Sequence, residues 1–357
     1  MGRKERIGVL TAGGDCPGLN AAIRAVAKAA FFEERAEVIG IKDGFDGLIH
    51  DHTRKLVWED VSGILTLGGT ILGTNNRADP FAYGEEKKDV SKLALDTFHK
   101  LKLDALVCIG GDGTFTVAHK LHQLGMPVVG IPKTIDNDLE QTDYTIGFNS
   151  AVAVATDSID KVHSTAESHH RVMIVEVMGR YVGWLALHAG VAGGADVILI
   201  PEIAFEMDKV CGELEKRSKL GKRFSIMVVA EGIRLGGTEL VIKREVKGST
   251  EPIRLGGVSY RIAEQIEQLT GLETRVAVLG HVQRGGTPTP FDRVLATQFG
   301  KKAVDLILAE EFGRMASIQG IKITSVPIQS AIVRQKKVTP DLPLVQAARA
   351  VGTCFGD

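Results

Sequence analysis

DALVCIGGDGT, at residues 104–114, joins a short apolar run to a glycine-rich turn, and this combination decides the fold. The run is rich in Val, Ile and Leu, as expected of a parallel strand that is buried on both faces. Similar runs occur at 7–12, 127–132, 172–178, 196–201, 225–231 and 275–280. Between the runs lie longer patterns, such as 20–34 and 290–312, whose apolar residues recur at helical spacing. This alternation predicts an α/β fold with mostly parallel sheets.

Length, charge and cysteine content limit the kinds of protein that this chain can be. A chain of 357 residues is long for a single core, so we expect two domains. Its 43 Lys and Arg nearly balance its 44 Asp and Glu, which argues against non-specific binding of nucleic acid or of an anionic membrane. No run approaches the roughly 18 apolar residues of a membrane span, and we expect a cytoplasmic protein. The scattered cysteines lack the C-x-x-C spacing of zinc and redox motifs.

The first glycine-rich loop, GGDCPGLN at 13–20, follows the strand-like run 7–12 and precedes a helical pattern. Backbone amides and the positive end of a helix should converge there, which suits a phosphate group. The loop matches neither the dinucleotide fingerprint nor the P-loop pattern. A tight turn without a ligand is the alternative interpretation.

The second loop, GGDGT at 110–114, follows the apolar run that begins at residue 104. Its glycines permit close approach of the backbone to a bound group, and Asp112 supplies one carboxylate. Because Mg²⁺ in proteins commonly takes one or two carboxylates together with phosphate oxygens, Asp112 is a candidate metal ligand. The alternative is an aspartate that caps the following helix.

The third loop, PKTIDND at 132–138, carries two carboxylates directly after a buried strand. In an extended segment Asp136 and Asp138 would point to the same side. One of them would then accept a proton while the other organises metal-bound water, and such a general base is typically worth about a hundredfold to ten-thousandfold in rate. An Asx-turn without catalytic function is the alternative.

These loops resemble, in their order and in their amino-acid sequences, the motifs of bacterial-type 6-phosphofructokinases. The patterns GGDxPGxN, GGDGT and PxTIDND each follow a strand, and further matching segments are HHR ending at Arg171, Met178-Gly179-Arg180, Pro201-Glu202, Ala230-Glu231-Gly232, Glu273-Thr274-Arg275 and HVQRGG at 281–286. The resemblance extends from residue 7 to at least residue 300. It implies a kinase that transfers a phosphoryl group to the carbon 1 hydroxyl of fructose 6-phosphate, which gives fructose 1,6-bisphosphate for glycolysis.

The resemblance also implies roles for individual residues. Asp136 would be the base, Arg180 would neutralise charge near the transferred group, and Asp112 would bind Mg²⁺, the expected cofactor. The donor would be bound by Gly13, Arg77, Gly111, Asp112, Gly113, Thr114 and Lys133. The sugar phosphate would be bound by Thr134, Asp136, Asp138, Arg171, Met178, Gly179, Arg180, Glu231, Arg275, His281 and Arg284.

Two of the arginines in the sugar-phosphate pocket have a further implication. Family members place two pocket arginines across a subunit boundary, and Arg171 and Arg275 match those positions. A homodimer or homotetramer with shared active sites is therefore implied.

The family architecture implies two Rossmann-like three-layer domains with the active site in the cleft between them. We expect a donor-binding domain at 1–147 plus about 283–335. The sugar-phosphate-binding domain would comprise 148–282 plus about 336–357, with the boundary near Phe148.

Within this family, two positions largely distinguish ATP-dependent from pyrophosphate-dependent enzymes. In this chain the residues at the two positions indicate different phosphoryl donors. Pyrophosphate-dependent relatives usually carry Asp after the metal-binding Asp and Lys in the third loop, whereas ordinary bacterial ATP enzymes carry Gly at both. This chain has Gly113 with Lys133. Gly113 leaves room for the α-phosphate of a nucleotide and Lys133 can hold a terminal phosphate of either donor, so we expect ATP, with pyrophosphate as the alternative. Arg77 takes the role of a donor-contacting arginine if one inserted residue is allowed.

The sequence bears on three alternative functions. A non-catalytic subunit that binds sugar phosphates for regulation would be expected to lose the metal ligand, the base or the donor glycines, and all are present. Lipid and NAD kinases share GGDGT but not TIDND with HVQRGG. Another acceptor, such as sedoheptulose 7-phosphate, stays open because arginines recognise phosphate better than chain length.

Overall fold

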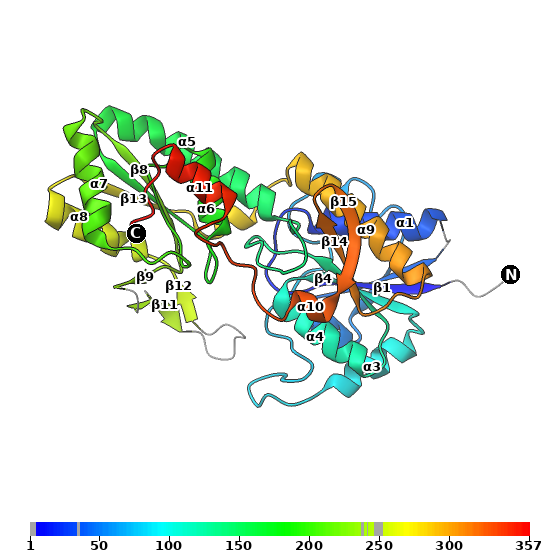
Figure 1. Ribbon diagram of the computed structural model, residues 1–357. Helices are drawn as coiled ribbons and strands as arrows, with labels where there is room; N and C mark the ends of the chain where they lie inside the picture. Colours follow the sequence, from blue (N-terminus) through cyan, green and yellow to red (C-terminus); the bar gives the residue numbers. More distant parts are fainter. Residues whose placement is uncertain (1–4, 34–35, 237–238, 241, 246–252) are drawn as a thin grey trace. The chain divides into compact units, whose positions relative to one another are not determined.

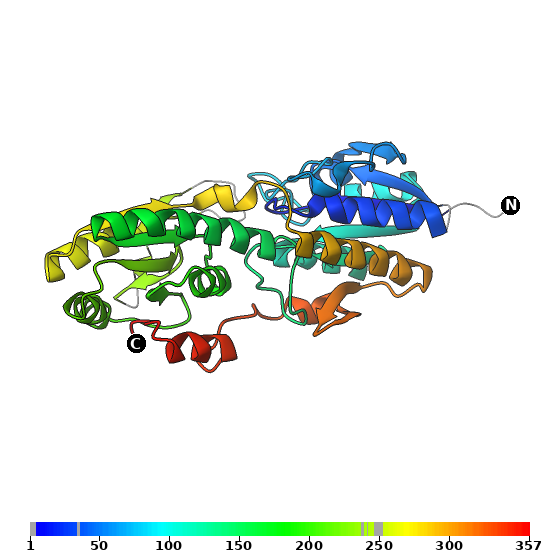
Figure 2. The same ribbon diagram turned by 90° about the horizontal axis from the view of Figure 1, so that it is seen from above.

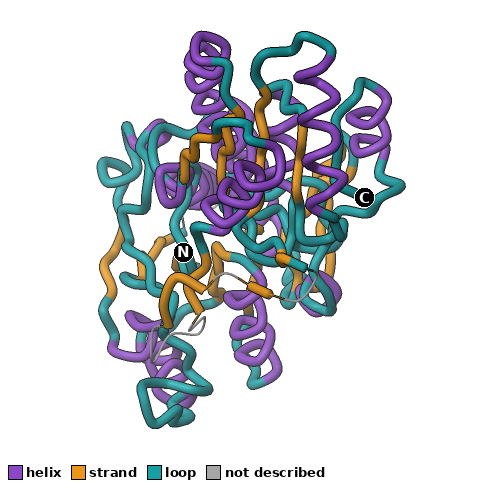
Figure 3. Tube along the Cα trace, turned by 90° about the vertical axis from the view of Figure 1, so that its left-hand side faces the viewer, coloured by secondary structure: helices purple, strands orange, loops and turns teal. Residues whose placement is uncertain are grey.

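The computed structural model describes residues 5–33, 36–236, 239–240, 242–245 and 253–357, and these form two compact units (Figure 1). Unit 1 contains the described residues up to Ser150 and those of Arg284–Gln335. Unit 2 contains the described residues of Ala151–Gln283 and those of Lys336–Asp357. Each unit has a largely or wholly parallel main sheet, which confirms the predicted α/β class. Figure 3 shows the alternation of helices, strands and loops along the chain.

The sheet of unit 1 has seven strands in the order β15-β14-β5-β4-β1-β2-β3. Its central pairs are parallel, and the outermost strands β15 and β3 are antiparallel to their neighbours. The strands are β1 (Arg6–Thr11), β2 (Glu37–Ile41), β3 (Thr53–Leu56), β4 (Ala105–Gly110), β5 (Val128–Pro132), β14 (Arg314–Gln319) and β15 (Lys322–Pro327). The central strands β1, β4 and β5 are buried almost throughout, as their apolar sequences require.

Helices cover this sheet, and α1 and α9 pack side by side (Figure 2). The helices are α1 (Leu19–Glu33), α2 (Phe45–His50), α3 (Ser91–Lys100), α4 (Asp112–Gln123), α9 (Pro290–Leu308) and α10 (Ile328–Ala331), with a 3₁₀ turn η1 (Ile64–Thr66). Phe115 of α4 and Leu10 of β1 belong to one hydrophobic core. Burial of one such side chain is typically worth about 1.5–3 kcal/mol.

The predicted helix at 290–312 is correct at its start but too long at its end. Pro290 opens α9, and the Thr289 side chain caps it by accepting the N–H of Asp292. The helix stops at Leu308 because Glu310 adopts a left-handed conformation with φ of 55°. The expected apolar periodicity continues past this point only because Phe312 follows in the loop.

Unit 2 has a parallel sheet in the order β13-β6-β8-β7. Its strands are β6 (Val172–Val177), β7 (Val197–Leu199), β8 (Ser225–Ala230) and β13 (Thr274–Val278). The two short antiparallel pairs are β9 (Arg234–Leu235) with β10 (Glu239–Leu240) and β11 (Ile242–Glu245) with β12 (Ile253–Leu255). The helices are α5 (Phe148–His169), whose first residues lie in unit 1, α6 (Trp184–Ala192), α7 (Met207–Lys219), α8 (Val258–Thr270) and α11 (Pro343–Ala350), and the 3₁₀ turn η2 (Gly280–Arg284) ends in unit 1.

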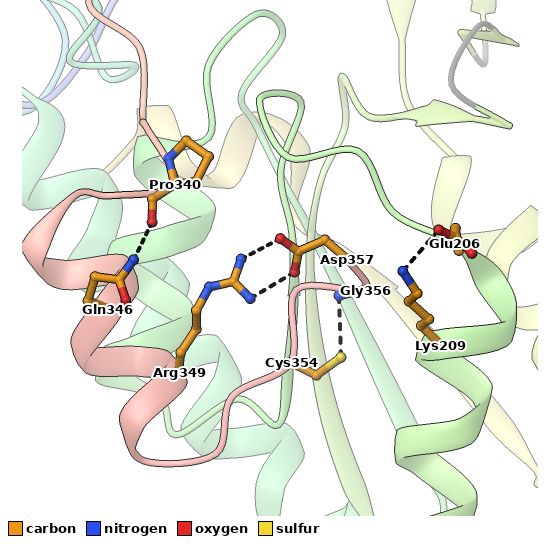
Figure 4. A network of polar contacts seen from close by, with 8 residues as sticks. All are labelled: Glu206, Lys209, Pro340, Gln346, Arg349, Cys354, Gly356 and Asp357. Carbon is orange, nitrogen blue, oxygen red and sulfur yellow. Dashed lines mark hydrogen bonds and ion pairs between the residues drawn. The ribbon is translucent and has the colours of Figure 1, made fainter.

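The C-terminal segment packs against the β7 edge of the unit 2 sheet. The Ile198 N–H donates to the Cys354 carbonyl oxygen at 2.9 Å. Arg349 on α11 binds both carboxylate oxygens of Asp357, at 2.8 and 2.6 Å (Figure 4). The main-chain bond pairs the edge that β7 would otherwise leave open, and the ion pair joins α11 to the last residue.

Two further features concern the cysteines and the helices. None of the four cysteines forms a disulfide within the described chain, and Cys16, Cys108 and Cys211 are buried. Among the described residues, every helix is either too short or too polar to span a bilayer.

Candidate active site

The three predicted loops of unit 1 lie at one edge of its sheet. β5, β4 and β1 are neighbours and run in parallel, with Thr11 opposite Ile109 and Gly110 opposite Pro132. The loops that follow these strands therefore share the carboxyl edge of the sheet, where ligands of open parallel sheets gather.

The loops also converge on one point, which is Gly13. A Cβ atom built on Gly13 would lie 3.5 Å from Thr114 Oγ1 of the second loop and 3.7 Å from Lys133 Nζ of the third. Gly13 itself has φ of 79°, a conformation that favours glycine. The first loop thus lies against residues that both other loops supply.

The main chain of Gly13 is bonded within the protein. Its N–H donates to the Asn75 carbonyl oxygen at 3.2 Å, and its carbonyl oxygen accepts from Thr74 Oγ1 at 2.7 Å. The sequence predicts that the amides of this loop converge on an anion, but the Gly13 amide is directed at Asn75 instead. Gly13 therefore offers a ligand close approach rather than a hydrogen bond.

Arg77 lies on the same segment as the residues that bond to Gly13. Its N–H donates to Asn75 Oδ1 at 2.7 Å, and the residue is exposed. Asn75 and Thr74 position this segment, and no local sequence pattern indicates this role for either of them.

In the second loop, Asp112 is the first residue of α4 and Gly111 is its N-cap. The exposed Asp112 carboxylate accepts the N–H of Gly113 through Oδ1 at 2.6 Å, so Asp112 is not the N-cap of the alternative interpretation. Thr114 is buried. A Cβ atom on Gly113 would have no atom of the described chain within 4 Å, so this position faces open space.

The third loop is a turn and not the extended segment that we predicted. Asn137 adopts φ of 52°, which asparagine tolerates better than most residues. Its Oδ1 accepts the N–H of Thr145 at 3.0 Å, and its Nδ2 donates to the Asp143 carbonyl oxygen at 3.0 Å. The Asp136 N–H donates to Thr134 Oγ1 at 3.1 Å. The turn therefore sets the directions of Asp136 and Asp138, and the alternation of an extended strand does not.

The carboxylates of the second and third loops influence one another. Burial, together with the negative charges of Asp136 and Asp112, raises the pKa of Asp138 from its ordinary 3.8 to about 7. Gln335 Nε2 donates to Asp138 Oδ2 at 3.3 Å. Negative charge from two loops thus accumulates at this edge of the sheet.

Lys133 is a buried cation in the same region. Its side chain is 3% exposed, and burial lowers its pKa from 10.5 to about 8. Nζ donates to the Ala12 carbonyl oxygen at 3.0 Å and to the Gly14 carbonyl oxygen. The ammonium is therefore bonded to the first loop.

The residues present suit a Mg²⁺ ion that is bound mainly through a phosphorylated ligand. Within the described part of the chain, no group of three or more His, Cys, Asp or Glu side chains is arranged to hold a metal ion. Mg²⁺ usually takes one or two carboxylates and completes its coordination with phosphate oxygens and water. The exposed Asp112 carboxylate, next to carboxylates whose mutual repulsion a divalent cation would relieve, fits this type of site.

In unit 2, the predicted sugar-binding residues follow three neighbouring strands. Met178, Gly179 and Arg180 follow β6, Glu231 follows β8, and His281 lies in η2 after β13. Because β13, β6 and β8 are parallel, these residues share the carboxyl edge of this sheet.

Hydrogen bonds link the segments at this edge of unit 2. The Glu231 N–H donates to the Val177 carbonyl oxygen at 2.9 Å, and the Met178 N–H donates to Gln283 Oε1 at 3.4 Å. Gly179 has φ of 136°, and a Cβ atom there would lie 2.8 Å from the Val182 carbonyl oxygen. Glycine is thus required at 179 for both conformation and space.

Arg171 and Arg275 lie at the opposite edge of this sheet. Arg171 precedes β6, and Arg275 is the second residue of β13. With a rise of about 3.3 Å per residue, Arg171 lies roughly 20 Å from the carboxyl edge, and Arg275, which pairs with Met173, lies roughly 13 Å from it. Both guanidinium groups contact the Glu273 carboxylate, Arg171 at 2.9 Å. Within one chain they do not join the residues that follow β6, β8 and β13.

Arg284 lies in unit 1, at the first loop. Its Nη1 donates to the Asp15 carbonyl oxygen at 3.0 Å, and a Cβ atom on Gly14 would lie 2.7 Å from the same nitrogen. The exposed His281, three residues earlier, lies in unit 2. The structure thus places two residues of the predicted 6-phosphate pocket in different units.

Comparison with known proteins gives a consistent result. A family model described as phosphofructokinase matches residues 6–307. The ATP-dependent 6-phosphofructokinase of Spirochaeta thermophila is 49% identical over 356 residues, which cover 98% of this chain and 97% of that protein. The pyrophosphate–fructose 6-phosphate 1-phosphotransferase of Streptomyces coelicolor is 47% identical over 352 residues, which cover 98% of this chain and all of that protein.

A solved structure agrees in fold. Phosphofructokinase from Saccharomyces cerevisiae matches with a TM-score of 0.80 and 34% sequence identity over 92% of this chain. The match covers 45% of the yeast chain, so this chain spans less than half of that protein's length.

Proposed function

The chain belongs to the phosphofructokinase family, and from this premise we propose that it is a 6-phosphofructokinase that uses Mg-ATP. It would transfer the terminal phosphoryl group of ATP to the carbon 1 hydroxyl of fructose 6-phosphate and so form fructose 1,6-bisphosphate. The proposal extends to a role in glycolysis in the cytoplasm, in agreement with the absence of disulfides from the described chain.

One observation carries the proposal: carboxylates from two loops accumulate at the carboxyl edge of β4 and β5. The negative charges of Asp136 and Asp112 both raise the pKa of Asp138. Asp136 would accept the proton of the attacking hydroxyl, and Asp138 would orient the sugar. A positioned base of this type contributes about a hundredfold to ten-thousandfold.

Phosphoryl transfer depends mainly on positioning and on neutralisation of charge. A bound Mg²⁺ ion would neutralise charge on the donor phosphates, and Asp112 is the residue that would hold it. Gly13, Gly111 and Thr114 would line the donor phosphates, and Arg77 would approach them from the neighbouring segment. Arg180 of unit 2 would neutralise charge on the transferred group.

Space at Gly113 supports ATP as the donor. A side chain at this position would project into a region without described protein atoms, which is the room that the additional phosphate of a nucleotide needs. Relatives of similar identity are named for either donor, so overall identity does not separate the two. A pyrophosphate-dependent phosphotransferase is the alternative function.

The acceptor would be bound by unit 2. Met178, Gly179, Glu231 and His281 follow neighbouring strands at one edge of its sheet. They would contact the sugar and its phosphate, together with Thr134 and Asp138 of the third loop and with Arg284.

Arg171 and Arg275 support a shared active site. They lie toward the amino ends of their strands, away from the carboxyl edge of their own sheet, so we propose that they bind the 6-phosphate of a sugar in the active site of a second copy. Guanidinium groups suit this role because they bind phosphate through paired N–H donors. A homodimer or homotetramer follows from this proposal.

The direct test is to incubate purified protein with Mg²⁺, ATP and fructose 6-phosphate and to identify the product. We expect fructose 1,6-bisphosphate from the wild type and a loss of about a hundredfold or more in the Asp112→Asn variant. Sedoheptulose 7-phosphate as competing acceptor measures the specificity of unit 2. Binding of fructose 6-phosphate without turnover would favour the non-catalytic regulatory function.

A further inference from the structure

The four carbonyl groups from Ala12 to Asp15, at the start of the first loop, each accept a hydrogen bond from a side chain. Lys133 Nζ binds the Ala12 and Gly14 oxygens, Thr74 Oγ1 binds the Gly13 oxygen at 2.7 Å, and Arg284 Nη1 binds the Asp15 oxygen at 3.0 Å. Two of these donors are cations, and all three come from segments distant in the sequence. Side chains from other parts of the chain therefore hold residues 12–15 in their conformation.

Fixing a carbonyl also fixes the amide that follows it. The peptide group is planar and trans, so the N–H of the next residue points away from the carbonyl oxygen. Lys133 therefore sets the orientation of the peptides between Ala12 and Gly13 and between Gly14 and Asp15. The Gly13 N–H, directed at Asn75, is one result of this orientation.

The same contacts remove a source of repulsion. Carbonyl oxygens carry partial negative charge and would repel a phosphate if they faced it. Bonded to an ammonium and a guanidinium group, the carbonyls of Ala12, Gly14 and Asp15 are instead directed at positive charge.

We propose that Lys133 is a positioning residue: it holds the 12–15 loop in the shape that receives donor phosphates, and it serves ATP and pyrophosphate alike. This inference rests on the proposed function for the identity of the ligand. It changes the role that the sequence suggested, because the hydrogen bonds of Lys133 go to the backbone of the protein. The choice of donor then depends on the space at Gly113.

Hydrogen exchange of the ligand-free protein tests the inference. Lys133→Met keeps most of the side-chain volume and removes the ammonium group. We expect amide exchange in a peptide covering residues 10–18 to accelerate by about tenfold or more, because the carbonyls lose their donor. Lys222→Met, at an exposed lysine of unit 2, is the matched control and should leave this peptide unchanged.

Kinetics separate positioning from a general loss of stability. In Lys133→Met the KM for ATP should rise by about tenfold or more, while the KM for fructose 6-phosphate stays within about threefold. In Lys133→Ala, added ethylammonium should restore slow exchange of the loop and a low KM for ATP. This second variant also carries the test if methionine at 133 prevents folding.

The outcomes are distinguishable from those of the proposed function. Exchange is measured without donor or sugar, so it tests the contacts of Lys133 even if the wild type transfers no phosphoryl group to fructose 6-phosphate. Unchanged exchange in the 10–18 peptide, together with a higher KM for ATP, would indicate direct contact with the donor and overturn the inference. Lack of rescue by ethylammonium in a folded Lys133→Ala protein would also overturn it.

Discussion

Gly113→Asp is the substitution that probes the donor site with least disturbance of the fold. Gly113 lies in the first turn of α4, its φ is outside the left-handed region, and a Cβ atom there meets no described atom within 4 Å. A second acidic residue at a helix N-terminus is compatible with the helix dipole. The variant should therefore fold with stability within about 0.5 kcal/mol of the wild type.

The expected effect on ATP follows from electrostatics. A carboxylate about 5 Å from one phosphate charge repels it by roughly 3 kcal/mol at an effective dielectric constant of about 20. Since about 1.4 kcal/mol corresponds to a factor of ten, kcat/KM for ATP should fall by roughly a hundredfold. Because Gly113 is exposed, the loss should shrink as the salt concentration increases.

Initial-rate kinetics with varied ATP and saturating fructose 6-phosphate measure this loss. Gly113→Asn is the matched control, because it adds a side chain of nearly the same size without charge and should lose about tenfold less than the aspartate variant. If Gly113→Asp keeps kcat/KM for ATP within about threefold of the wild type, the assignment of this space to a nucleotide phosphate is refuted.

Three further substitutions test other parts of the molecule. Asp136→Ala should lower kcat by about a hundredfold or more and leave the binding of fructose 6-phosphate within about tenfold in a titration, since a base assists only the transition state. When Asp136→Ala and Arg171→Ala proteins are mixed and allowed to exchange subunits, part of the wild-type rate should return, because a shared site can take Asp136 from one subunit and Arg171 from the other. No recovery would contradict shared active sites. Glu176→Ala should lower the free energy of unfolding in urea by about 2–4 kcal/mol, because the Gly257 and Ser259 N–H groups lose their buried acceptor. An undiminished unfolding midpoint would argue against that role.

The buried strands could be predicted from the sequence, and the edge strands could not. β4 and β5 are buried on both faces, so their apolar runs are continuous. β3, with the sequence TRKL, is an edge strand with mostly half-exposed or exposed residues. A strand that buries little apolar surface carries no such signal, and its place depends on pairing with β2.

Candidate residues that directly follow a strand could be selected from the sequence. Asp112 and Lys133 are examples, because each follows a buried strand. Asn137 could not be selected, because its importance lies in a left-handed turn that the assumption of an extended segment excluded. The contact of Arg284 with Asp15 joins residues 269 positions apart, and no local pattern indicates such a pair.

The positions of Arg171 and Arg275 could be predicted from the order of residues along the chain and the direction of the parallel strands. Both residues come at or before the start of predicted parallel strands, whereas Arg180 and His281 come after the ends of the same strands. Their separation within one chain follows from this order alone. That Glu273 is the common counter-ion of both arginines could be recognised only from the structure.

Phosphorylation of fructose 6-phosphate in the presence of Mg²⁺, with ATP and pyrophosphate compared on the same preparation, tests the central claim most directly. We expect the enzyme to form fructose 1,6-bisphosphate with ATP at a rate about tenfold or more above that with pyrophosphate. A faster rate with pyrophosphate, or no bisphosphate with either donor, would contradict the proposed function.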